Sequence, residues 1–197
     1  MATVGFERAI VGVHEKNTDS EKVTQEFDIN SKKGGTVDAK ITGLAAASNT
    51  TFASDGAFHV SAVGSGSPKC AFQVADLYPE LYDAITGAEK TPQGYTALGK
   101  NTRPPYVSII FISHDKDGNE LYIALLKGKF GAPDEELKTA EDKGSELQTD
   151  SIEGNFVNRG LDGYAYVKAK AEPNDNGQAL EEFKAFVFNN AEAPTTP

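Results

Sequence analysis

The sequence of this chain predicts a mainly β fold, a β-sandwich or barrel of antiparallel hairpins with one or two short flanking α-helices. Three observations support this prediction. Short runs that alternate apolar and polar residues are separated by turns rich in Gly, Asp and Ser. One pair of runs is apolar on both faces, and two other stretches repeat apolar residues at helical spacing. We expect about nine or ten short strands.

The stretch 103–130 predicts the hairpin around which the rest of the chain packs. Its two apolar runs, Tyr106–Ile112 and Leu121–Leu126, flank the turn sequence Asp115–Asn119. In each run both alternating sets of side chains are apolar, whereas a strand with one wet face has only one such set. Both faces therefore need cover, from the chain's own sheet, a helix or another subunit.

The N-terminal part predicts a hairpin and a further strand. Residues 4–13 and 23–29 are apolar and β-branched, and they pair across a polar turn. Residues 36–42 alternate most regularly, with Asp38 and Lys40 on the polar face of a strand whose Val37, Ala39 and Ile41 face inward. Residues 44–56 are small and polar, which predicts a long mobile connection with room for a short strand at its centre.

Further strands follow in the middle and near the end of the chain. Residues 58–62 and 70–74 both alternate apolar and polar side chains, and the Gly-rich turn between them predicts that they form a hairpin. Residues 152–157 and 164–169 are two more strands, joined by a turn.

Two amphipathic helices are predicted. Asp76 is placed to cap the first, which has Pro79 in its first turn and ends at Gly87. Asp175 followed by Gln178 resembles a capping box at the start of the second. We expect one domain over residues 1–189 and a flexible tail over 190–197.

Composition limits the classes of function. Acidic residues outnumber basic ones by 29 to 19, and the net charge of −10 has the wrong sign for tight binding to a phosphate backbone. A single cysteine, Cys70, excludes an internal disulfide framework and fits a reducing compartment. The sequence contains neither a signal peptide nor an apolar stretch long enough to cross a bilayer, so we expect synthesis in the cytoplasm.

The sequence offers no recognisable catalytic or metal site. His14, His59 and His114 lie on separate predicted strands, without the spacing of three or four that a helical metal site requires. Cys70 alternates with core residues, which favours a buried small apolar role over a nucleophile. We therefore expect no enzymatic activity, no cofactor and no metal.

One turn imitates the opening of a calcium loop. Asp115, Asp117 and Asn119 supply alternating oxygens, but Glu120 stands where that loop needs Gly, and Leu126 where it needs a bidentate Glu. The turn interpretation is favoured.

Four segments, taken in order, resemble the major tail protein family of long-tailed, non-contractile bacteriophages. They are ATVGFERAIVGV, GGTVDAKITGLAAA, CAFQVADLYPELYDAITG and KNTRPPYVSIIFISHDKDGNELYIALLKGKF. The resemblance extends from Ala2 to about Ala171, and its specificity comes from the order of segments that are individually weak.

This resemblance implies a virion protein with a tail-tube-like fold. It implies that six copies close into a ring, that rings stack into a tube, and that double-stranded DNA passes through it without specific binding. The implied partners are other copies of the chain, a tape-measure protein, and tail terminator and distal tail proteins, with no membrane and with assembly in the host bacterial cytoplasm. The family has no active site to carry over.

Two surfaces are candidates for roles in such a tube. The connection containing Asn49, Thr50, Thr51, Phe52, Ala53 and Ser54 is a natural contact between rings, ordered on assembly. The face bearing Asp38 and Lys40, or the acidic stretch 132–155, is a candidate for the lumen, where like charge keeps phosphates from binding. The alternative that both are outer, solvated surface stays open.

A cell-surface or carbohydrate-binding β-sandwich module is the alternative function. Carbohydrate sites present aromatic platforms, yet the chain has no Trp, and most of its seven Tyr fall at core-like positions. The assembly hypothesis is therefore favoured.

Overall fold

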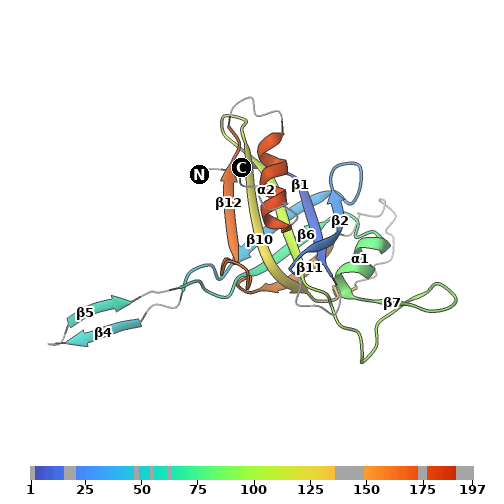
Figure 1. Ribbon diagram of the computed structural model, residues 1–197, viewed down its shortest axis with the longest axis horizontal. Helices are drawn as coiled ribbons and strands as arrows, with labels where there is room; N and C mark the ends of the chain where they lie inside the picture. Colours follow the sequence, from blue (N-terminus) through green and yellow to red (C-terminus); the bar gives the residue numbers. More distant parts are fainter. Residues whose placement is uncertain are drawn as a thin grey trace, which may run out of the picture.

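The computed structural model describes residues 3–15, 21–46, 49–53, 56–61, 64–135, 149–172 and 177–189. In these residues an eight-stranded antiparallel sheet is accompanied by two short helices and two small two-stranded ribbons (Figure 1). The predicted mainly β fold is confirmed. The predicted tail, 190–197, lies outside the described residues, so the domain boundary at 189 stays a prediction.

The elements follow one another along the chain as β1 (Thr3–His14), β2 (Val23–Ile29), β3 (Thr36–Thr42), β4 (Asn49–Ala53), β5 (Gly56–Ser61), β6 (Lys69–Val74), α1 (Pro79–Thr86), β7 (Glu89–Lys90), β8 (Thr96–Ala97), β9 (Val107–Asp115), β10 (Glu120–Phe130), β11 (Asp150–Phe156), β12 (Tyr166–Lys170) and α2 (Gln178–Val187). The predicted hairpins β1–β2 and β9–β10 are both present.

The sheet has the strand order β2-β1-β9-β10-β11-β6-β3, and β12 pairs with β10 beside this path. Strand β10 belongs to two layers, because Leu121–Leu125 pairs with β12 whereas Gly128–Phe130 pairs with β11. The sheet curls back on itself, and the Thr36 hydroxyl in β3 donates to the Phe6 carbonyl in β1 over 2.9 Å. The result is a sandwich with β2, β1, β9, β10 and β12 in one layer and β11, β6 and β3 in the other.

The chain itself covers both faces of the central hairpin. Val107, Ile109 and Phe111 in β9 face the core between the two layers. Ile110 and its neighbours on the opposite face pack under α2 in a second apolar cluster. Cover from an adjoining subunit, one of the options left open by the sequence, is not needed here.

Helix α2 lies close against β1. A Cβ on Gly12 would come within 2.8 Å of the Phe188 ring and of Val23, so this strand position accepts only glycine without a shift of its neighbours. Phe188 and Val187 at the end of the helix are fully buried. The helix is thereby fixed over the strands β1, β9 and β10.

The turn between β9 and β10 confirms the turn interpretation of Asp115–Asn119. One carboxylate oxygen of Asp115 accepts the backbone N–H groups of Asp117 (2.8 Å) and Asn119 (2.9 Å), and Gly118 adopts a φ of 84°. The other oxygen pairs with the ammonium of Lys170 at 2.5 Å. The carboxylate is therefore engaged in closing the hairpin.

The predicted hairpin between residues 58–62 and 70–74 is wrong. Strand β5 pairs with β4, and β6 pairs with β11 on one side and with β3 on the other. Alternating inward residues of β6, with Phe72 and Val74 fully buried, place this strand in the middle of a layer. Apolar alternation shows that a segment is a strand, but it does not identify the partner.

The predicted cap of the first helix is also wrong. Helix α1 begins after Tyr78, whose backbone is extended, and no side chain caps it. Asp76 stands too early, whereas Pro79 in the first turn and the left-handed Gly87 at the C-terminal end are as predicted. For the second helix Asp175 lies outside the described residues, and Gly177 is the capping residue of α2.

One residue of the regularly alternating strand β3 also departs from its predicted face. A register shift between Thr36 and Asp38 leaves Val37 in a bulge, with 47% of its surface exposed. Ala39 and Ile41 pack against the core as expected.

Candidate assembly surfaces

The outer face of the layer β3–β6–β11 is polar, as the sequence predicted for Asp38 and Lys40. Both residues are exposed on β3. Two rows of cross-strand neighbours run across this face. In one row Asp38 in β3 pairs with Gln73 in β6, which pairs with Ser151 in β11, and in the other Lys40 pairs with Ala71, which pairs with Glu153. Inward side chains of the same strands fill the core, so this face is the wet side of a one-sided sheet.

The charges on this polar face are mixed. Thr42 stands opposite Lys69, which stands opposite Asn155, and Lys129 of β10 continues the same row. Three lysines, Lys40, Lys69 and Lys129, thus share the face with Asp38 and Glu153. The expected excess of negative charge is not found there, and most of the acidic stretch 132–155 lies outside the described residues.

The predicted connection 44–56 contains strand β4, which forms a two-stranded ribbon with β5. The ribbon extends away from the body of the protein, toward the left in Figure 1. Its neck is held by a β-bridge between Ala45 and Ser65 and by a hydrogen bond from the Gly66 N–H to the Leu44 carbonyl over 3.2 Å. Of the predicted contact residues, Asn49–Ala53 form β4, and Ser54 lies outside the described residues.

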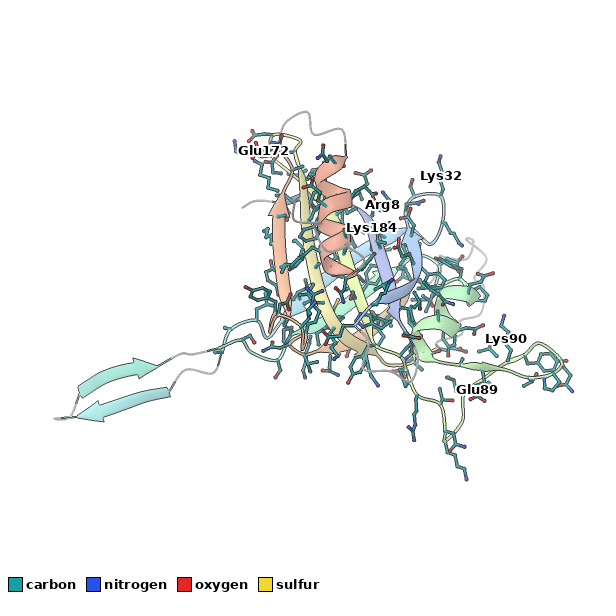
Figure 2. All side chains as sticks on the ribbon, in the orientation of Figure 1. Arg8, Lys32, Glu89, Lys90, Glu172 and Lys184 are labelled. Carbon is teal, nitrogen blue, oxygen red and sulfur yellow. The ribbon has the colours of Figure 1, made fainter. Side chains whose placement is uncertain are left out.

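A second projection was not expected from the sequence. Strands β7 and β8 form a short arm, residues 89–103, that leaves the body on the side opposite the ribbon (Figure 1). Thr96 at its base donates to the Asp83 carboxylate of α1 over 2.8 Å, and Lys90 lies 3.4 Å from the same carboxylate. Figure 2 shows Glu89 and Lys90 at the start of this arm. Two-residue strands carry too little alternation to be recognised in a sequence.

Arg159 organises an exposed apolar patch. Its side chain is 2% exposed and donates to the carbonyls of Phe186 and Val187, each over 3.1 Å, and its guanidinium also pairs with the Asp162 carboxylate. The loop that carries Arg159 and the adjoining end of α2 bear four large apolar side chains with exposed fractions between 44% and 64%, namely Val157, Leu161, Tyr164 and Phe186. We call these four residues the apolar patch.

One open hollow on the described surface, of about 410 Å³, is lined by Glu21, Lys127 and three neighbours. The Glu21 carboxylate is already engaged there, by Lys127 at 2.8 Å and by the N–H groups of Gly160 (2.7 Å) and Leu161 (3.0 Å). It therefore closes a loop rather than serving as an acid or base.

The candidate catalytic residues are the three histidines and the single cysteine. His14 is buried and hydrogen-bonded to Ser108, and His114 lies 3.3 Å from Glu7 on the surface, while the side chain of His59 is outside the described part. Burial raises the pKa of the Cys70 thiol to about 12, so it carries no thiolate near neutral pH. Among the described residues no cluster of His, Cys, Asp and Glu could hold a metal ion.

Comparison with known protein families supports the assembly hypothesis. A family model described as phage tail tube protein matches residues 1–186 of the chain. The chain belongs to the phage tail tube protein family. A search of curated proteins gave no match.

A tail tube protein is a structural component of the phage tail, so membership implies self-assembly into a tail tube and association with other tail proteins. Membership of a structural family suggests a protein without enzymatic activity. Within the described residues, no helix has the length and apolar character to cross a membrane.

Proposed function

We propose that six copies of this tail tube protein close into a ring, that rings stack into the tail tube, and that the tube conducts DNA during ejection into the host cell. The family match over residues 1–186 is the observation that carries this proposal. In the virion the tube occupies the tail, and its assembly takes place in the host bacterial cytoplasm around a tape-measure protein. Tail terminator and distal tail proteins bound its two ends.

Free strand edges support closure into a ring. Among the described strands, β2, β3 and β12 each pair with one other strand only. Such edges carry unpaired N–H and C=O groups and invite pairing with another chain. When copies are related by a rotation, an edge strand of one copy can pair with a different edge strand of the next, which gives hydrogen-bond partners to these N–H and C=O groups. If the successive rotations add up to a full turn, the copies form a closed ring without free edges.

The polar face of β3–β6–β11 is the part of the surface that we assign to the lumen. Asp38, Lys40 and Glu153 stand out from it, and it bears no large exposed apolar patch that would bind another protein. Its alternation of positive and negative side chains avoids a continuous basic groove, which would hold phosphates tightly. DNA can therefore slide along it without specific binding.

The β4–β5 ribbon is the part that we assign to contacts between rings. It leaves the body through a bonded neck at Ala45 and Ser65, and it pairs with none of the strands of the sheet. An isolated two-stranded hairpin is only marginally stable in water, so it gains stability from a partner surface. A neighbouring ring supplies that surface in a tube.

Negative-stain microscopy of the purified chain over a range of protein and salt concentrations tests the proposal. We expect tubes of constant diameter, and end-on views with six-fold symmetry. A protein that stays monomeric under every condition would refute tube formation, and rings with another symmetry would refute the number of copies. A glycan array in parallel, with specific saturable binding, would favour the carbohydrate-binding alternative.

A further inference from the structure

The arm and the apolar patch lie on opposite sides of the protein. In Figure 1 the arm containing β7 extends to the right of the body, whereas the β4–β5 ribbon extends to the left. The patch belongs to the ribbon side, because the Ser65 hydroxyl at the ribbon neck donates to the Asn158 side chain over 2.8 Å. Asn158 lies within the loop that carries Val157, Leu161 and Tyr164.

The arm presents two large apolar side chains to solvent. Tyr95 is 70% exposed and Leu98 is 48% exposed. Neither is carried by a loose segment, since the Thr91 N–H donates to the Tyr95 carbonyl over 2.9 Å and the Tyr95 N–H donates to the Thr91 hydroxyl over 3.1 Å. The Gly99 N–H donates to the Thr102 hydroxyl over 2.8 Å directly after Leu98. A backbone held in this way loses little conformational entropy when the arm binds a partner.

The backbone of the apolar patch is also fixed by hydrogen bonds. The buried Arg159 fixes Phe186 through its carbonyl, and its backbone N–H donates to the Tyr164 carbonyl over 2.8 Å. Glu21 accepts the N–H of Leu161 over 3.0 Å. Single exposed apolar residues are ordinary, but four gathered on one fixed loop and the adjoining helix end are typical of an interaction site.

We propose that Tyr95 and Leu98 on the arm of one copy dock on the apolar patch of a copy in the next ring of the tube. The inference rests on the proposed stacking of rings. A protrusion on one side and an apolar receiving surface on the opposite side form a heterologous, head-to-tail contact, which adds copies without limit along an axis. The ribbon leaves from the patch side, so both projections cross the same ring-to-ring junction, in opposite directions.

This assignment names an aromatic and an aliphatic side chain as the anchors of the junction. Aromatic side chains at the centre of an interface dominate binding energy, and the residues around them mainly exclude water. The arm therefore makes a second contact between rings, in addition to the contact made by the ribbon. Its loss is expected to lower stacking without affecting the fold of a single copy, because both anchors are exposed in that copy.

Disulfide cross-linking of the full chain tests the contact directly. The native Cys70 is 1% exposed, so cysteines introduced by Tyr95→Cys and Leu161→Cys are the reactive pair. Under mild oxidation of assembled tubes we expect the double variant to give a covalent ladder that extends beyond the number of copies in a ring. The control pair Tyr95→Cys with Lys32→Cys, at the exposed turn after β2 (Figure 2), is expected to stay monomeric on a denaturing gel.

The outcomes separate this inference from the function on which it rests. Tubes without any ladder overturn the docking of arm on patch, and a ladder that stops at the ring number overturns its axial direction, while both leave tube formation intact. A wild-type chain that never forms tubes overturns the proposed function itself.

A charge exchange provides a second measurement if the cysteine pair prevents assembly. Leu98→Lys and Leu161→Glu are each expected to slow elongation by about tenfold or more, and together to restore most of the rate. Lys32→Glu is the matched surface control. Failure of the double variant to recover above the single variants would overturn the pairing.

Discussion

His14 in β1 and Ser108 in β9 are joined in the core by a hydrogen bond of 2.7 Å between Nε2 and Oγ. The Ser108 hydroxyl donates its own hydrogen to the Leu126 carbonyl over 2.6 Å, so the imidazole donates through Nε2. Its Nδ1 is buried without a hydrogen-bond partner in the described part of the chain. Burial, helped by the nearby positive charge of Lys127, lowers the pKa of His14 to about 4.

The buried imidazole predicts that the single copy loses stability in mild acid. The unfolded chain binds the proton of this histidine near pH 6.5, whereas the folded chain binds it only near pH 4. The contribution of neutral His14 is therefore fully present above about pH 6.5 and is lost as the pH falls toward 4. We expect a loss of about 3 kcal/mol in the free energy of unfolding across this window, measured by denaturant titration of the monomer.

Two variants identify the residue responsible. His14→Gln removes the titrating group and is expected to flatten this part of the pH dependence. His114→Gln, on the partly exposed histidine beside Glu7, is expected to leave it in place. If the slope in the His14 variant equals that of the wild type, the buried imidazole is not its source.

Arg159 predicts a large effect of one substitution on stability. Removing its guanidinium in Arg159→Ala takes away the positive charge that faces the Asp162 carboxylate and one donor each from the carbonyls of Phe186 and Val187. Loss of one partner of a buried charge pair costs about 3–5 kcal/mol. The free energy of unfolding of the monomer measures this loss.

Arg8 offers the matched control for Arg159. It pairs with Asp28 through two hydrogen bonds, but about two-fifths of each side chain is exposed to water. Exposed ion pairs contribute about 0–1 kcal/mol, so Arg8→Ala is expected to have little effect. Equal losses for the two substitutions would contradict the structural role of the buried arginine.

The ribbon predicts a separation of folding from elongation. Replacing Asn49–Ser54 by a Gly/Ser linker of equal length removes β4, which pairs with β5 alone among the described strands. The body is expected to keep its stability within about 0.5 kcal/mol, since none of its contacts change. Elongation, followed by light scattering, is expected to fall sharply. Tubes that grow at the wild-type rate would show that these residues make no ring-to-ring contact.

The assignment of the lumen predicts a difference in accessibility on assembly. A Lys40→Cys variant is expected to react, as a monomer, with a maleimide attached to a bulky protein, because Lys40 is exposed. In assembled tubes the same reagent is expected to be excluded from the bore, while Lys32→Cys remains reactive. Equal labelling of both positions in tubes would place Lys40 on the outer surface.

Much of the local structure could be predicted because it depends on short-range patterns. Alternation of apolar and polar residues marked β3 and β6, and apolar runs marked β1, β2, β9 and β10. Asp115 with Gly118 marked the turn of the central hairpin. The partner of β6 could not be predicted in the same way. The alternation of apolar and polar residues in β6 is compatible with any neighbouring strand that buries the same face. The strands that actually pair with it depend on how the whole sheet closes.

Short-range patterns also predicted some features of the candidate surfaces and missed others. The wet face with Asp38 and Lys40 follows from periodicity, whereas the bulge that exposes Val37 depends on the register with β6. The arm was missed because its strands are two residues long. The apolar patch was missed because Arg159 joins a loop to the end of α2, which is 27 residues away in the chain at Phe186.

The sequence by itself determined a mainly β protein with a doubly apolar central hairpin, and in the order of its segments it carried the family resemblance. Only the tertiary structure decided which strands pair, that the chain seals its own hairpin, and which side chains remain outside to meet another copy. The physical reason is the distance along the chain over which each kind of interaction acts. Backbone propensity and periodicity act over a few residues, whereas packing and exposure depend on segments that meet only after the sheet has curled.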